Sequence, residues 1–318
     1  MSASETAETA PAASVVVCTR GRGAGIEATA RAILAIQHPN FELIVVDQSE
    51  DDATEVALQP FAGDSRLRYL HTDTVGTGRS RNIGLRAAHS PFILYTDDDW
   101  LVPPDWIDKM LAPFQANERV AVVFCAVTPL VKEIEAGFTP NFEFTVSRTV
   151  SSLWQYYYRH GMGAGMGVRR SAMYEIGGFD DWMGPGSKFM SGEDADIAIR
   201  ALCLGWQRYD TAETTVIHDG LRPWSRYTEL ARRDWFSLGG TYAKPLRSGY
   251  PALYFITLFQ LIGRGLLEPF GTIFRGQRPK GFKRFLFLLQ GLAAGLRHPI
   301  DKKLILYQDQ DYKFGVNS

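Results

Sequence analysis

Short apolar runs alternate with helical patterns through the first third of this 318-residue chain. The runs are continuous and rich in β-branched residues, which predicts strands buried on both faces of a parallel sheet. They are "SVVVCT" (14–19), "FELIVVD" (41–47), "RLRYLHT" (66–72) and "PFILYTD" (91–97). Segments with helical spacing lie between them, at 26–37, 52–61 and 79–89. This alternation predicts an α/β fold with a mostly parallel sheet flanked by helices.

The pattern continues less regularly beyond this point. Helices are expected at 105–115, from 170 to Gly177-Gly178, and from 191 to a stop at Gly205, and strands at 120–127 and 214–218. The stretch 128–160 is aromatic and irregular, 161–170 is glycine-rich, and long helices follow from about residue 221. The N-terminal "MSASETAETAPAAS" lacks the basic and apolar regions of a signal peptide, so a disordered tail is expected over 1–12.

Charge and cysteine content exclude some classes of protein. The formal net charge is −1, so no global field attracts nucleic acid, and none is expected as a partner. Cys18, Cys125 and Cys203 lie scattered in apolar runs without metal-ligand spacing. They are expected to be free thiols in a reducing compartment, which predicts a cytoplasmic protein.

Polar side chains follow the predicted strands where each one ends. Thr19 and Arg20 follow the first strand, Asp47 ends the second, and Asp97-Asp98-Asp99 follow the fourth. The carboxyl ends of parallel strands form one rim, where ligands usually bind. In an extended chain Asp97 and Asp99 share a face, and their carboxylates suit Mg²⁺ or Mn²⁺. The alternative is a solvated loop or a helix cap.

Three further motifs could carry chemistry, and each has a structural alternative. The glycines of "GTGRSRNIGLRAA" (76–88) can bring backbone amides to a phosphate, or form a plain loop. "MSGEDADIAIR" (190–200) resembles a capping box, but its acids exceed what capping needs, so one can be a general base. His218 ends a strand and can bind metal or phosphate, or be structural.

Taken in order, these motifs resemble those of the family-2 glycosyltransferases, which have a GT-A fold. The matching segments are "SVVVCTRGR", "LIVVDQSEDD", "RSRNIGLRAA", "YTDDDW", "GGFDD", "GEDADIAIRALCLGW" and "VIHDG". The resemblance implies a GT-A catalytic domain over 13–220, followed by a C-terminal helical region over 221–318. It also implies a nucleotide-diphosphate-sugar donor and a divalent cation, Mg²⁺ or Mn²⁺, that grips the diphosphate.

The resemblance implies roles for particular residues. Asp194 matches the catalytic base and Glu193 is the other acid of that pair. Asp97 and Asp99 match the outer acids of the family's D-x-D metal site, with His218 as a further ligand. Asp98 is expected to turn toward the donor sugar or ribose. The implied donor-binding residues are Thr19, Arg20, Asp47, Arg81, Asn82, Asp97 and Asp98. Gln48-Ser49 after Asp47 departs from the family pattern, which leaves the base open among uracil, thymine and guanine, with a UDP- or dTDP-sugar as the expected donor.

The implied reaction is sugar transfer to an acceptor hydroxyl with inversion at the anomeric carbon. Two other classes remain: a nucleotidyltransferase acting on sugar phosphates, and a binding module that kept the fold without catalysis. A nucleotidyltransferase would release pyrophosphate instead of a nucleoside diphosphate. Acceptor contacts are expected from Trp154, Tyr156–Tyr158, Trp182 and Met183, whose side chains could stack on a sugar ring.

The sequence of the C-terminal third predicts a surface that binds membranes. Thr257, Gln260, Arg264 and Glu268 form one narrow polar stripe on a helix that is otherwise apolar. The basic segment "RGQRPKGFKR" (275–284) lies between two apolar runs. This combination favours a helix lying on an anionic inner-leaflet surface. The alternative is packing on the catalytic domain or in a homo-oligomer. A glycolipid or cell-surface polysaccharide acceptor would fit a membrane location.

Overall fold

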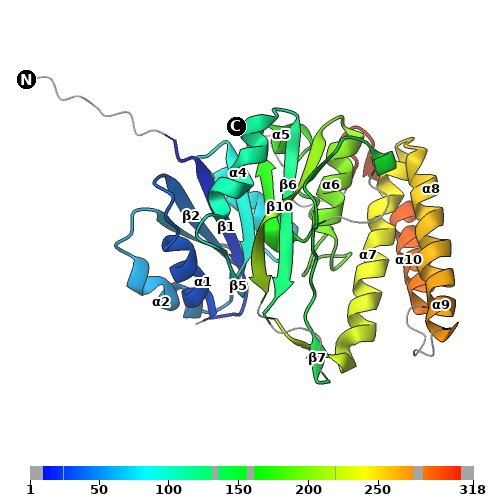
Figure 1. The fold of residues 1–318 in the computed structure, drawn as a ribbon, viewed down its shortest axis with the longest axis horizontal. Helices are drawn as coiled ribbons and strands as arrows, with labels where there is room; N and C mark the ends of the chain where they lie inside the picture. The colour runs from blue at the N-terminus through cyan, green and yellow to red at the C-terminus, as the bar shows by residue number, and fades with distance from the viewer. Residues whose placement is uncertain are drawn as a thin grey trace, which may run out of the picture.

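A mixed sheet forms the centre of the computed structural model, which describes residues 10–23, 25–130, 135–155, 161–218, 220–274 and 282–308. The strand order in this part of the chain is β3-β2-β1-β4-β9-β6-β10-β5, and β8 pairs with β10 beside this path. The strands are β1 (Ala13–Thr19), β2 (Phe41–Asp47), β3 (Leu67–His71), β4 (Phe92–Asp97), β5 (Trp100–Leu101), β6 (Val120–Pro129), β8 (Arg148–Val150), β9 (Met166–Arg169) and β10 (Gln207–His218). The curled sheet and its flanking helices have the GT-A-like architecture that was predicted (Figure 1).

The sheet is less uniformly parallel than predicted. Strands β1 to β4 are mutually parallel where they pair, and so are β6 and β10. Strand β9 runs antiparallel between β4 and β6. It was missed because it is short and comes from the glycine-rich segment, where strand propensity is low. Since β9 opposes both neighbours, β4 and β6 point the same way, and the carboxyl ends of all six long strands meet at one edge.

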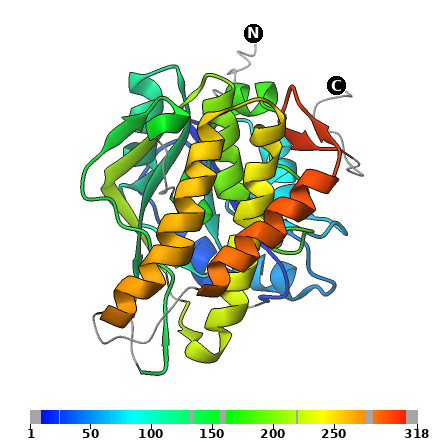
Figure 2. The same cartoon turned by 90° about the vertical axis from the view of Figure 1, so that its right-hand side faces the viewer.

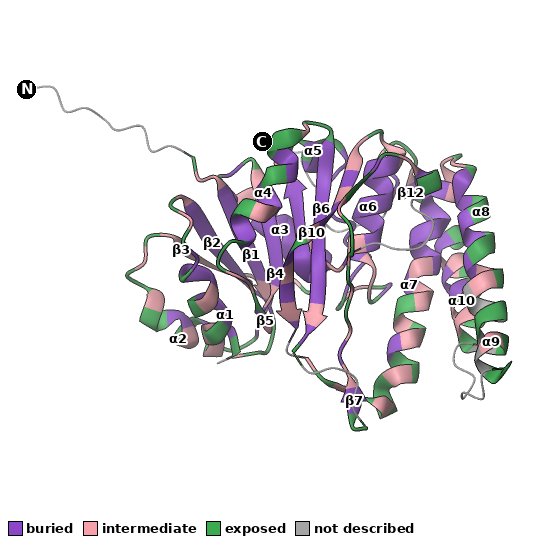
Figure 3. Cartoon of the chain, in the orientation of Figure 1, coloured by how far each residue is buried: buried purple, intermediate pink, exposed green. Residues whose placement is uncertain are grey.

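Helices cover both faces of the sheet. Val15 and Val17 of β1 face one core with α1, α2 and α4, whereas Val16 faces the other core with α3, α5 and α6. Both faces are therefore buried, as the continuous apolar runs predicted (Figure 3). These helices are α1 (Gly25–Leu34), α2 (Ala53–Leu58), α3 (Thr77–Ala87), α4 (Trp106–Ala116), α5 (Arg170–Glu175) and α6 (Glu193–Cys203).

The predicted C-terminal helical region is present and packs as a further layer outside α6 (Figure 2). It comprises α7 (Tyr227–Arg247), α8 (Ala252–Phe259), the π-helix η5 (Gln260–Leu267), α9 (Glu268–Phe274) and α10 (Phe282–Arg297), followed by the hairpin β12 (Ile300–Asp301) and β13 (Leu306–Tyr307). The short strands β7 (Gly137–Phe138) and β11 (Arg222–Pro223) pair just before α7. Among the described residues, no helix is long and apolar enough to cross a bilayer.

A buried ionic network joins this layer to the part of the chain that forms the central sheet. Lys244 of α7 is fully buried and pairs with Asp180 and with Asp196, the latter at 2.6 Å. Asp196 also accepts from Arg200 Nε at 2.8 Å, and Asp180 accepts from the Tyr307 backbone N–H at 3.0 Å. Asp196 is one of the acids that helix capping does not require, and it therefore has a structural role in this network.

The expected N-terminal tail lies mostly outside the described residues, which begin at residue 10. The Tyr156–Tyr158 segment and most of the basic stretch 275–284 also lie outside them.

Candidate active site

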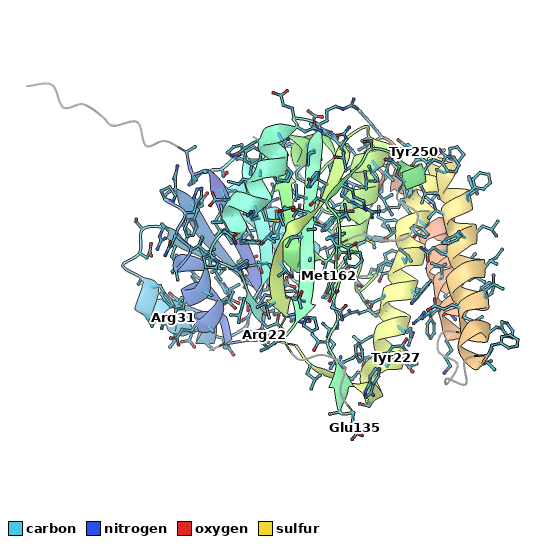
Figure 4. All side chains as sticks on the ribbon, in the orientation of Figure 1. Arg22, Arg31, Glu135, Met162, Tyr227 and Tyr250 are labelled. Carbon is cyan, nitrogen blue, oxygen red and sulfur yellow. The ribbon has the colours of Figure 1, made fainter. Side chains whose placement is uncertain are left out.

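Two adjoining cavities open at the carboxyl edge of the sheet. The smaller, of about 280 Å³, is lined by residues that follow β1, β2, β4 and β10, including Thr19, Gln48 and Asp97–Asp99. The larger, of about 430 Å³, lies between the start of α6 and the first half of α7. The two share Arg81, Asp97, Met162, Pro185, Glu193 and Arg222. Figure 4 labels Met162 between the sheet edge and α7, and Arg22 on the side of the smaller cavity.

The Asp triplet sits where the chain turns between β4 and β5. Asp98 turns inward: its Oδ2 accepts from Thr19 Oγ1 at 2.6 Å, and its backbone carbonyl accepts from Thr29 at 2.9 Å. Arg22 pairs with Asp99 at 2.9 Å and approaches Asp98 at 3.5 Å. Asp97 faces Arg81 instead, at 3.5 Å. All three carboxylates line the smaller cavity, so the predicted convergence of strand-end polar groups is found there.

These carboxylates fit a divalent cation that arrives with a phosphate ligand. Desolvation and the nearby Asp99 and Asp98 carboxylates raise the pKa of Asp97 to about 6, against the opposing effect of Arg81. In the described residues, no group of three or more His, Cys, Asp or Glu side chains is arranged to hold a metal by itself. Mg²⁺ usually takes one or two protein carboxylates and completes its shell with water and substrate phosphates. Asp97 and Asp99 can supply those two carboxylates.

His218 lies on the same cavity wall. Its ring stacks on Trp100, with centroids 4.1 Å apart and planes 7° from parallel, because β5 and β10 pair in register there. Its Nδ1 lies 3.0 Å from the Pro140 carbonyl. A carbonyl only accepts, so Nδ1 carries the proton and Nε2 carries the lone pair. That tautomer suits a metal ligand role, whereas binding a phosphate oxygen requires a proton on Nε2 as well.

Arg81 is the buried cation at the junction of the two cavities. It donates to Glu193 Oε1 at 3.0 Å and lies over the rings of Tyr95 and Phe179. Burial and the adjacent Asp194 raise the pKa of Glu193 above its ordinary value, although Arg81 opposes this. Gly163 lets the backbone at this position lie close to the Arg81 guanidinium, because a Cβ there would lie 2.6 Å from the Arg81 terminal nitrogens.

Asp194 is presented to the larger cavity by the start of α6. Gly192 precedes the helix with φ +81°, in the left-handed region that favours glycine. Asp194 Oδ2 accepts from the Gly163 N–H at 3.0 Å, and Oδ1 accepts from the Ala195 N–H at 2.7 Å. Two backbone donors thus fix the carboxylate while it stays partly exposed. The capping-box alternative is wrong, because Ser191 Oγ donates to Asp234 and makes no cap hydrogen bond.

Two predicted donor residues do not line either cavity. Asp47 is fully buried, and its oxygens accept from the Ser49 N–H and Oγ and from Tyr69 OH. Asn82 uses its side chain to hold the Phe179 backbone, through its Oδ1 and Nδ2, each at 2.9 Å. Arg20 does line the smaller cavity, where it also approaches Glu50 at 3.5 Å.

The three expected acceptor residues that the structure describes also lie away from the cavities. Trp154 is 60% exposed and packs against Phe255 of α8. Trp182 stacks on Tyr307, with ring centroids 5.2 Å apart. Met183 is fully buried in the same small core. Each is therefore used in packing with the C-terminal layer.

Other lining residues were not singled out from the sequence. Gln48 and Ser80 line the smaller cavity, and α7 and α10 contribute to the larger one. Gln48 had been noted only as a departure from the family pattern. The contributors from β11, α7 and α10 are Arg222, Arg233, Asp234, Trp235, Leu238 and Arg284. The one available signal for them was the clustering of arginines with an aromatic residue in 222–235.

Comparison with known proteins agrees with the family resemblance of the sequence motifs. The family described as Glycosyl transferase family 2 matches residues 14–177. A glucosyl-dolichyl phosphate glucuronosyltransferase of Haloferax volcanii is 25% identical over 59% of this chain and 62% of its own length. A pre-mycofactocin glycosyltransferase of Mycobacterium tuberculosis is 27% identical over 74% of this chain and 48% of its own. The matches thus span less than two thirds of either relative.

A solved structure shares the fold over most of the chain. It is the mannosyltransferase PcManGT from Pyrobaculum calidifontis in complex with GDP-Man and Mn²⁺. The TM-score is 0.62 at 18% sequence identity, with 91% of this chain and 88% of that chain covered. At this identity the likeness concerns the fold.

Proposed function

Because this chain belongs to glycosyl transferase family 2, we propose that it moves a sugar from a nucleotide diphosphate donor to an acceptor hydroxyl, with inversion. The observation that carries the proposal is the Asp194 carboxylate, fixed by two backbone N–H groups in a cavity that adjoins the one lined by the Asp triplet. The smaller cavity is the proposed donor site and the larger one the proposed acceptor site. Acceptor-dependent release of nucleoside diphosphate is the result that tests this function.

The proposed step is a single displacement. Asp194 takes the proton of the acceptor hydroxyl as that oxygen bonds to the anomeric carbon. The bond between the anomeric carbon and the diphosphate oxygen breaks, and the nucleoside diphosphate leaves. Attack from the side opposite the leaving group inverts the anomeric centre. Arg81 holds Glu193 beside the base, and the same guanidinium lies near Asp97 at the border of the donor site.

The donor is proposed to contact Thr19, Arg20, Arg81 and Asp98, with Asp47 and Asn82 supporting the donor site from behind its wall. Asp97, Asp99 and His218 would hold a divalent cation. When bound, the cation would neutralise charge on the departing diphosphate. The proposed nucleotide is UDP or dTDP. The proposed acceptor is a glycolipid or a cell-surface polysaccharide. The glucosyl-dolichyl phosphate in the name of the Haloferax relative supports a glycolipid.

Removing divalent cations is expected to abolish transfer. Treatment with EDTA should reduce the rate to background, and added Mg²⁺ or Mn²⁺ should restore it. The Asp99→Ala variant should lose metal-dependent binding of a nucleoside diphosphate, measured by calorimetry with and without Mn²⁺. Asp105→Ala, an exposed carboxylate just before α4, is the matched control and should bind normally. Unchanged binding by Asp99→Ala would argue against its role as a ligand.

The outer face of α8, η5 and α9 is proposed to lie on an anionic membrane surface at the cytoplasmic side. Thr257 and Gln260 of the predicted polar stripe are buried, whereas Leu258, Phe259 and Ile262 are about half exposed. The helix therefore turns its apolar side outward (Figure 3). The neighbouring segment 275–284 carries basic residues and no acid, which favours anionic lipid over a second copy of the chain.

A charge placed on this face is expected to weaken membrane binding. Phe270 and Ile273 are each almost half exposed near the end of α9. The Phe270→Glu/Ile273→Glu variant should float with anionic vesicles several-fold less than the unaltered protein. Val56→Glu, at a more exposed apolar site on α2, is the control and should float normally. Equal flotation of all three proteins would contradict the membrane assignment.

A further inference from the structure

Four arginines and four carboxylates line the larger cavity. The carboxylates already have protein partners: Glu193 and Asp97 pair with Arg81, Asp234 pairs with Arg233, and Asp194 accepts two backbone N–H groups. Arg284 is also engaged, since it donates to Tyr227 OH at 2.7 Å. Two guanidinium groups remain to be explained.

Arg222 is the first of these. It follows β10 on the short strand β11 and lines both cavities. Within the described parts of the chain, its side chain makes no hydrogen bond or ion pair. Partial burial and the neighbouring Arg233 cation lower the pKa of Arg222, against the opposing effect of the Asp234 and Asp99 carboxylates.

Arg233 of α7 is the second. Only its Nε is engaged, by Asp234 Oδ1 at 3.0 Å, so its terminal nitrogens have no side-chain partner among the described residues. Two adjacent guanidinium groups repel each other unless an anion lies between them. Guanidinium forks match the oxygen atoms of phosphate and carboxylate groups, and hydrogen bonds between such charged groups are strong.

We propose that the acceptor is acidic: it carries a phosphoryl or carboxylate group that binds between Arg222 and Arg233, in the cavity that holds Asp194. This inference rests on the proposed function, because it takes the larger cavity to be the acceptor site. Trp235, which lies under the Arg284 guanidinium at 5.6 Å, lines the same cavity and offers an apolar surface for the sugar ring. The anion would hold the acceptor while its hydroxyl reaches Asp194.

Calorimetry on the full chain tests this inference without requiring turnover. The donor site is first filled with a nucleoside diphosphate and Mn²⁺, and that binding is recorded. Glucose 1-phosphate, glucuronate and methyl glucoside are then titrated separately. One or both acidic probes should bind at least tenfold more tightly than the neutral one, and the pair distinguishes a phosphoryl from a carboxylate ligand. Equal binding of all three probes, or binding of none, would overturn the inference.

Variants locate the anion. Arg222→Gln should weaken binding of the preferred acidic probe roughly tenfold or more, the effect expected for a lost charged hydrogen bond. Arg226→Gln removes an exposed arginine that pairs with Glu229 and should bind the probe normally. If Arg222→Gln instead loses only nucleoside diphosphate binding, Arg222 belongs to the donor site and the inference fails. Failure of the unaltered protein to bind any nucleoside diphosphate would count against the proposed function, separately from the acidic-probe result.

Discussion

Replacing Asp194 with Asn is expected to lower kcat roughly 10³-fold while leaving donor binding intact. That loss corresponds to about 4 kcal/mol of transition-state free energy. The amide has nearly the same shape, and its single oxygen can keep one of the two hydrogen bonds from the Gly163 and Ala195 N–H groups, but it cannot take the acceptor proton. Nucleoside diphosphate binding by calorimetry, alongside initial rates, separates the two effects.

A matched variant shows whether the loss is specific to the base. Asp234→Asn removes a carboxylate from the same cavity whose hydrogen bonds within the described residues are to Ser191 and Arg233, so its kcat should change far less than that of Asp194→Asn. Near-normal turnover by Asp194→Asn would mean that another group accepts the proton. Glu193 is then the next candidate, since it adjoins Asp194 and lines both cavities.

Replacing Lys244 with Met is expected to destabilise the fold by about 3–5 kcal/mol, the cost of breaking a buried ion pair. Met has a similar length but leaves the Asp180 and Asp196 carboxylates buried without their shared cation. Urea denaturation, followed by circular dichroism, measures the change in free energy of unfolding. The loss would reach the site as well, because Asp196 lies in the same turn of α6 as Asp194.

Controls keep this prediction specific to the buried network. Lys303→Met removes an exposed lysine near the C-terminal hairpin and should change the free energy of unfolding by less than about 0.5 kcal/mol. Adding Asp180→Asn to Lys244→Met should recover part of the loss, because one uncompensated charge is removed. A loss below about 1 kcal/mol for Lys244→Met alone would contradict the account of the network.

The sequence predicted the first strands of the sheet and their carboxyl edge well because the signals there are local. The run 41–47 coincides with β2, and the carboxylates after β4 line a cavity beside His218. Strand ends of a parallel sheet must meet at one edge, so their polar residues could be placed without knowing any contact. Strand β9 escaped because its glycines carry no strand signal and its position depends on pairing with β4 and β6.

The proposed acceptor side could not be predicted in the same way. Trp182 and Met183 looked suited to sugar stacking, but both pack in the small core around Tyr307. Arg233 and Trp235 instead reach the cavity because α7 packs beside α6, and Arg222 reaches it from β11. That packing includes the ion pairs of Lys244 with Asp180 and Asp196. These three residues are far apart in sequence or lie in different motifs. No periodicity or spacing announces such a contact.

Product analysis tests the central claim most directly. The protein, with Mn²⁺, is incubated with UDP-, dTDP- and GDP-sugars and the acidic and neutral acceptors, and phosphorus NMR follows the products. Sugar transfer predicts a nucleoside diphosphate that forms in proportion to glycosylated acceptor, with no pyrophosphate. A parallel reaction with nucleoside triphosphate and sugar phosphate should stay silent. Pyrophosphate release in that second reaction, with no nucleoside diphosphate in the first, would contradict the account and identify a nucleotidyltransferase.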